Sequence, residues 1–171
     1  RLASDSLRKG CRQCIYHLEL FVTTHVRSFQ LLVVYIDFET TGLDILRDSI
    51  CEFGVLAHRS SDAFSTIVRP PILPSAEFAV HGISDEELAQ CPSFEATFKR
   101  FVEFLQNLAN TSAVDLESSD EEPGLTTRFR SNVQILLCGH NAHKFDFPFS
   151  LSEVLRHNMS VSPFEQWLYV D

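Results

Sequence analysis

The chain has 171 residues, with 14 basic and 23 acidic side chains and a net charge of −9. Hydrophobic residues make up 44% of the sequence and charged residues 22%, which is typical of a globular domain and excludes a disordered chain. Every apolar run is broken well before about 18 residues, so we expect no transmembrane helix and no membrane partner. The acidic balance argues against a surface that coats nucleic acid by positive charge. It does not exclude an enzyme that reaches phosphates through metal ions.

The cysteine content favours a reducing compartment. The five cysteines form no regular framework, and no signal-peptide pattern is present, so we expect a cytoplasmic or nuclear location. Residues 1–30 mix helix and strand signals and are expected to form an N-terminal extension of unknown role, ahead of one domain over residues 31–171. Because the sequence starts at Arg1 rather than Met, we expect it to be a fragment or a processed piece.

The first part of the domain favours strands. Residues 31–38 form a short, continuous and β-branched apolar run, which is typical of a buried central strand. Residues 50–59 and 64–69 predict two more strands, and the short run of turn residues between them favours an antiparallel hairpin.

Two helix signals follow. Ser84 and Glu87 have the spacing of an N-terminal capping box, which predicts a short helix over residues 84–90. A longer helix, from 92 to about 110, is predicted by apolar residues that recur at three- and four-residue spacing and form one buried stripe. The stripe consists of Phe94, Phe98, Phe101, Val102, Leu105 and Leu108.

The last part of the chain contains an acidic segment and then three more elements. Residues 112–124 carry five acidic residues and no basic residue, which predicts a solvated, flexible loop within the domain. Residues 133–139 predict another buried strand, residues 145–156 a helix, and residues 167–171 a final apolar strand.

Three carboxylates are candidates for a metal site. Asp37 and Glu39 are two residues apart at the end of the first predicted strand, so their side chains point to the same side. Two acids beside an apolar strand are costly unless a cation neutralises them, and oxygen ligands suit Mg²⁺ or Mn²⁺. Asp146 follows the 133–139 strand and would share their pocket if the two strands are neighbours. Three carboxylates could then hold two ions, roughly 4 Å apart, for phosphodiester cleavage.

Three motifs resemble those of the DEDD-type 3′–5′ exonucleases. Residues 37–42 (DFETTG) resemble the first motif, residues 81–83 (HGI) the substrate-loop motif, and residues 140–146 (HNAHKFD) the second acidic motif. They occur in the family's order, and the match covers the whole predicted domain. The segments 51–59 and 145–149 are similar both to the three-prime repair exonuclease branch and to the exonuclease-like domain of some promyelocytic-leukaemia-type proteins.

The resemblance implies a role for each matching residue. Asp37 would bridge two metal ions, Glu39 would bind the first ion and orient the attacking water, and Asp146 would bind the second ion. These three residues would be both catalytic and metal-binding, with two Mg²⁺ or Mn²⁺ ions as cofactor. Residues implied to bind or shape the substrate site are Thr41, Gly42 and Leu43 at the terminal nucleotide, His81 and Ile83 in the base pocket, and Asn141.

The resemblance is incomplete at the C-terminus. In the histidine form of the family, a third motif, His-x-x-x-x-Asp, supplies the general base and the fourth metal ligand, and no such pair follows Asp171. We therefore expect a C-terminally truncated exonuclease domain that is largely inactive alone. The implied fold is α/β and ribonuclease-H-like, with a five-stranded mixed sheet and helices on both faces.

The expected function is metal-dependent hydrolysis of phosphodiester bonds at the 3′ end of nucleic acid, with DNA favoured over RNA. The alternative is a catalytically inactive exonuclease-like domain that serves as a nucleic-acid or protein binding module. The presence of Asp37, Glu39 and Asp146 favours the enzyme, because a site without metal would gain stability by losing mutually repelling acids. The oligomeric state is left open, with a homodimer as one alternative.

Overall fold

The computed structural model describes residues 29–71, 82–117 and 132–171. Nearly all of the expected N-terminal extension lies outside the described residues, as does His81. Among the described helices, none has the length and apolar character needed to cross a membrane.

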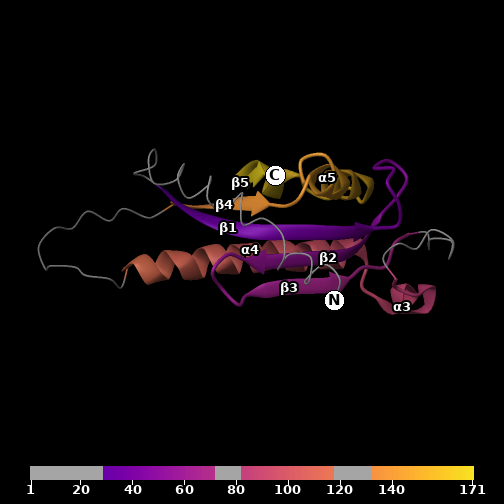
Figure 1. Cartoon of the computed structure of the whole chain (residues 1–171), viewed down its shortest axis with the longest axis horizontal. Coiled ribbons are helices and arrows are strands. Elements are labelled where there is room, and N and C mark those ends of the chain that lie inside the picture. Colours follow the sequence, from indigo (N-terminus) through magenta and orange to yellow (C-terminus); the bar gives the residue numbers. More distant parts are fainter. Residues whose placement is uncertain (1–28, 72–81, 118–131) are drawn as a thin grey trace, which may run out of the picture.

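The centre of the fold is a five-stranded mixed sheet in the order β3-β2-β1-β4-β5 (Figure 1). β1 pairs antiparallel with β2, and β2 with β3, whereas β1 and β4, and β4 and β5, are parallel. The predicted hairpin and the two added parallel strands are thus confirmed. The strands are β1 (Phe29–Thr40), β2 (Ile50–Ala57), β3 (Ala63–Ile67), β4 (Asn132–Cys138) and β5 (Trp167–Val170).

Helices connect the strands and pack on the sheet. They are α3 (Asp85–Gln90), α4 (Phe94–Glu117), α5 (Asp146–Arg156) and the 3₁₀ helix η1 (Ser162–Gln166). The predicted cap of α3 is confirmed, because the Ser84 side chain accepts a hydrogen bond from Glu87 N at 3.2 Å. α4 lies along the length of the sheet, and α5 lies near the end of β1 (Figure 1).

Helix α4 is longer than the sequence predicts. It extends to Glu117, so residues 112–117 of the expected acidic loop are helical, while 118–124 lie outside the described residues. Near its predicted end, Thr111 Oγ1 donates to Asn107 O at 3.0 Å and Ser112 Oγ donates to Leu108 O at 2.9 Å. These hydroxyls bond to the preceding helical turn instead of ending the helix, so the polar composition misled the sequence argument.

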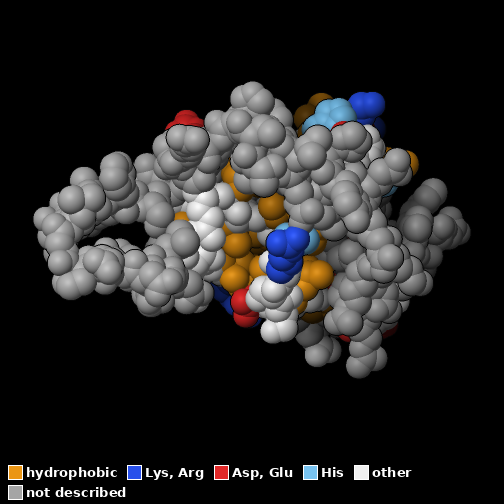
Figure 2. All heavy atoms as spheres, turned by 60° about the vertical axis from the view of Figure 1, so that its left-hand side comes forward, with side chains coloured by type: hydrophobic (Ala, Val, Ile, Leu, Met, Phe, Trp, Pro, Cys, Tyr) orange, Lys and Arg blue, Asp and Glu red, His pale blue; other side chains and the backbone are white. Residues whose placement is uncertain are grey.

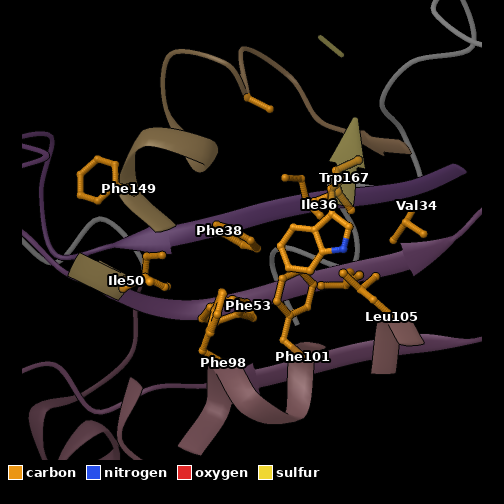
Figure 3. Close-up of a cluster of buried hydrophobic side chains, with 14 of the residues drawn as sticks. Val34, Ile36, Phe38, Ile50, Phe53, Phe98, Phe101, Leu105, Phe149 and Trp167 are labelled. Carbon is orange, nitrogen blue, oxygen red and sulfur yellow. The ribbon is translucent and has the colours of Figure 1, made fainter. Parts of the chain in front are cut away.

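The core is aromatic and joins α4 to the sheet (Figure 3). The ring of Phe53 on β2 lies 4.5 Å from that of Phe38 and 5.4 Å from that of Phe101, centroid to centroid. Trp167 on β5 packs edge-on against Phe101 at 5.7 Å. The predicted stripe of α4 is confirmed as core, and α5 adds Phe149 to the same cluster. This packing fixes β1 between the two helices.

Truncation of Phe101 tests this core. Phe101 is 1% exposed and contacts aromatic rings of β1, β2 and β5. We expect Phe101→Ala to lower the free energy of unfolding by about 3–5 kcal/mol, because it leaves a cavity at the centre of the cluster. Urea denaturation measures the loss, with Lys99→Ala on the exposed face of α4 as the control, expected to change stability by less than about 0.5 kcal/mol. Equal losses in the two variants would contradict this account of the core.

Candidate active site

The end of β1 places two carboxylates on the side of the sheet opposite the core. Ile36 and Phe38 point into the core, so Asp37 and Glu39 point the other way. In the β1–β2 register Asp37 lies opposite Gly54, and the ladder is irregular directly after Glu39. The predicted pairing of Asp37 and Glu39 on one face therefore agrees with the strand register.

Asp146 reaches this strand end from the first turn of α5. Its side chain is 3% exposed, and its Oδ1 accepts a hydrogen bond from Phe38 N at 2.8 Å. Phe38 is the residue between Asp37 and Glu39, so this bond ties the third carboxylate to the strand that carries the other two. A carboxylate in the first turn of a helix is also favoured by the helix dipole.

The path from β4 to Asp146 depends on a glycine. A Cβ atom on Gly139 would lie 2.7 Å from the backbone oxygen of Ile36 and 3.0 Å from the side chain of Ala142. The chain can therefore leave β4 this close to β1 only with glycine at that position. Asn141 follows in the left-handed conformation, with φ of 56°, and its carbonyl accepts bonds from Lys144 N and Phe145 N. The side chain of Asn141 is exposed, so the structure assigns this residue to the turn that starts α5.

The three carboxylates interact electrostatically. The pKa of Asp146 is raised to about 7, mainly by burial and also by the negative charges of Asp37 and Glu39. The hydrogen bond from Phe38 N opposes this increase, because it stabilises the ionised form. Without a cation, Asp146 therefore holds a proton up to nearly neutral pH. The charges of Asp37 and Glu39 thus act on Asp146, and the assignment of these three carboxylates to one metal site stays a prediction.

The donor set suits a divalent cation by its chemistry. Carboxylate oxygens are the ligands that Mg²⁺ and Mn²⁺ prefer, and burial together with the charges of Asp37 and Glu39 raises the pKa of Asp146. In the side-chain arrangement of the described residues, no group of three or more His, Cys, Asp or Glu converges as a ready-made metal site. Asp146 Oδ1 is engaged by Phe38 N in this arrangement.

A fourth carboxylate was missed by the sequence analysis. Glu52 lies opposite Glu39 in the β1–β2 register, on the same face of the sheet, and is 4% exposed. Glu39 and Glu52 both contribute to raising the pKa of the Cys51 thiol to about 12, after burial as the main cause. The sequence signal that could have identified Glu52 is an acidic residue within the otherwise apolar run of β2.

The loop after β1, residues 41–49, is held by internal hydrogen bonds. Thr41 N donates to Ser49 O at 2.8 Å, and Ser49 N donates back to Thr41 Oγ1 at 3.0 Å. Asp44 N donates to Asp48 Oδ2 at 2.8 Å. A Cβ atom on Gly42 would collide with the carboxylate of Asp48, so a larger residue there would displace that side chain.

This loop exposes two large apolar side chains. Leu43, predicted to contact the terminal base, is 83% exposed, and Leu46, which the sequence analysis did not single out, is 80% exposed. Apolar side chains on a hydrogen-bonded loop beside the carboxylates are available to a base or sugar. Ile83 is half-buried just before α3, whereas His81, predicted beside it, lies outside the described residues.

His143 contacts Asp171, the residue that follows β5. His143 N donates to Asp171 Oδ1 at 3.0 Å, and His143 Nδ1 forms an ion pair with Asp171 Oδ2. The pKa of Asp171 is lowered, mainly by that backbone hydrogen bond and also by the charge of His143. The ion pair of His143 with Asp171 therefore links the 139–145 loop to the residue after β5.

The fold and the carboxylates agree with the family to which the chain belongs. The model of the exonuclease (RNase T) family matches residues 34–122, about half of the chain, and the chain is a member of this family. The chain is 26% identical to the chloroplastic/mitochondrial exonuclease DPD1 of Arabidopsis thaliana in an alignment of 145 positions, which covers 82% of this chain and 39% of that protein.

Solved structures of Escherichia coli exonuclease I share the ribonuclease-H-like fold. The zinc-bound complex with single-stranded DNA has a TM-score of 0.54 and 17% identity, covering 83% of this chain and 28% of that one. The complex with a dT13 oligonucleotide has a TM-score of 0.53 and 15% identity, with the same coverage. The chain thus spans well under half the length of these relatives.

The protonation of Asp146 predicts how stability depends on pH. The folded state binds this proton more tightly than the unfolded state, so the contribution is favourable at low pH and is lost as pH rises toward 7. We expect wild type in EDTA to lose about 2–3 kcal/mol more than Asp146→Asn between pH 5 and pH 8. Urea denaturation at both pH values measures this difference. Parallel changes in the two proteins would contradict it.

Proposed function

We propose that the chain is the nuclease domain of a metal-dependent 3′–5′ exonuclease. The observation that carries the proposal is the contact between buried Asp146 and Phe38 N, which brings a third carboxylate to the Asp37 and Glu39 pair. Membership of the exonuclease family supports hydrolysis of nucleic acid as the reaction. The 3′ direction follows from the DEDD motifs that the family resemblance implies.

Asp37, Glu39 and Asp146 are the residues that would hold Mg²⁺ or Mn²⁺, two ions in the proposed site. A bound divalent cation supplies positive charge that stabilises the developing charge on the phosphate and activates water. The protein contributes the strand face that aligns Asp37 with Glu39 and the hydrogen bond that orients Asp146.

The substrate in this proposal is the 3′ end of nucleic acid, with DNA favoured over RNA. The exonuclease I structures described above are complexes with single-stranded DNA and with a dT13 oligonucleotide, which supports a nucleic-acid partner here. On the face shown in Figure 2 the described side chains are largely hydrophobic, and basic side chains occupy a small area. Separately, the exposed Leu43 and Leu46 of the 41–49 loop suit contact with bases better than electrostatic coating of a long duplex.

The alternative remains a catalytically inactive domain that binds nucleic acid or protein. The burial of Asp146 beside two other acids argues against it, because the raised pKa marks an arrangement that is unfavourable without a cation. We also propose a place in the three-prime repair or promyelocytic-leukaemia exonuclease-like branch and a cytoplasmic or nuclear location. The described cysteines, Cys51, Cys91 and Cys138, are free thiols, as this location requires.

Removal of the shared ligand tests the proposed function. We expect wild type to release nucleotides from a 5′-labelled oligonucleotide only with Mn²⁺ or Mg²⁺, and Asp37→Ala to lower that rate by about 10²-fold or more. Glu103→Gln, an exposed acid on α4, is the control and should keep the wild-type rate. The rate is measured by gel analysis of product lengths over time.

Two further substrates define the direction of cleavage. A blocked 3′ end should stop the reaction, whereas a blocked 5′ end should not. Cleavage that persists in EDTA, or an equal rate for Asp37→Ala and wild type, would contradict the metal site. Tight oligonucleotide binding without any product in either metal would favour the binding-module alternative.

A further inference from the structure

The second half of α5 carries a buried carboxylate that the proposed chemistry does not use. Glu153 is fully buried, with a relative exposure of 0%, although it is charged in its ordinary state. Its Oε1 accepts a hydrogen bond from Ile50 N at 3.2 Å and one from Arg156 Nη2 at 2.8 Å. His157 Nε2 lies 3.2 Å from its Oε2. A buried carboxylate with these partners is costly to retain unless it orders the groups around it.

Glu153 is linked to the C-terminal end of the loop at residues 41–49 through Ile50 and through Arg156. Ile50 is the first residue of β2, directly after the loop, and Arg156 Nη2 also donates to the backbone oxygen of Asp48 at 2.5 Å. One turn earlier on α5, Ser152 Oγ donates to the backbone oxygen of Ile45 at 2.8 Å. Ser152 and Arg156 thus bind backbone oxygens of the loop, and Glu153 binds the first residue after it.

The outgoing half of the loop is fixed to the returning half. Asp48 accepts hydrogen bonds from Asp44 N at 2.8 Å and from Thr41 Oγ1 at 3.3 Å, and its carboxylate lies against Gly42. The constraint therefore runs from Glu153 through Asp48 to the backbone around Leu43. Leu43 itself is 83% exposed and does not belong to the hydrophobic core.

We propose that Glu153 is a positioning residue for substrate binding, which holds the 41–49 loop against α5 so that Leu43 is preformed for the terminal nucleotide. The inference rests on the proposed function and deepens it. Because α5 begins with Asp146 and ends with this anchor, one rigid helix sets the spacing between the carboxylates and the nucleotide-binding loop. Preorganisation of a loop lowers the entropic cost of binding.

The experiment measures oligonucleotide binding and metal binding separately. Fluorescence anisotropy gives the Kd for a 5′-labelled single-stranded DNA with a free 3′ hydroxyl and a phosphorothioate terminal linkage, and calorimetry gives the Kd for Mn²⁺ alone. The variants are Glu153→Gln, Arg156→Met and the control Glu95→Gln. Glu95 contacts the far side of His157, with Oε1 2.8 Å from Nδ1, and is therefore in the same charge network but makes none of the hydrogen bonds that hold the loop.

We expect Glu153→Gln and Arg156→Met to weaken oligonucleotide binding by about tenfold, since a loop displaced by about 1 Å loses its fit to the nucleotide. Their Kd for Mn²⁺ should stay within about twofold of wild type, and Glu95→Gln should match wild type in both measurements. If Glu153→Gln does not fold, Arg156→Met still tests the positioning role. The Arg156 side chain is 31% exposed, so we expect its replacement to disturb the fold less.

Wild-type oligonucleotide affinity in both variants would overturn the positioning role. A loss of Mn²⁺ binding equal to the loss of oligonucleotide binding would also overturn it, since it would show general damage to the fold. Wild type that binds no 3′ end at all is a different result, because it contradicts the proposed function itself.

Discussion

The hydrogen bond from Phe38 N to Asp146 is the contact on which the site depends. Phe38 belongs at once to the aromatic core, through its ring, and to the site, through its backbone amide between Asp37 and Glu39. Core packing of the Phe38 ring therefore positions β1, which carries Asp37 and Glu39. The backbone amide of Phe38 positions the third carboxylate, Asp146. An apolar core of this density tolerates little displacement, which is why a residue distant by 108 positions can be placed reliably beside β1.

The site combines two opposing electrostatic effects. Burial and the acids on β1 make ionised Asp146 unfavourable, while the amide of Phe38 and the N-terminus of α5 favour it. A divalent cation would change this balance by adding positive charge beside Asp146. These opposing effects are the physical reason for proposing that Asp146 binds metal together with Asp37 and Glu39.

Local patterns predicted most of the fold. The apolar runs of β1, β2 and β4, the Ser84 cap and the stripe of α4 all depend on short-range periodicity, and each is present. The same holds for Asp37 and Glu39, which are two residues apart. Glu153 was not predictable, because its partner Ile50 lies 103 residues away and no sequence period connects them. The true end of α4 was missed because hydroxyl groups can bond within a helix as well as end it.

Titration of the Asp146 carboxyl carbon by NMR, with and without Mg²⁺, tests most directly whether this group senses Asp37 and Glu39 and binds metal. Without metal, we expect a midpoint near pH 7, because the carboxyl is buried beside Asp37 and Glu39. With saturating Mg²⁺, the midpoint should fall by at least about one pH unit, since the cation stabilises the ionised form. A midpoint near 4 that Mg²⁺ does not change would show that Asp146 neither senses the other two acids nor binds the metal.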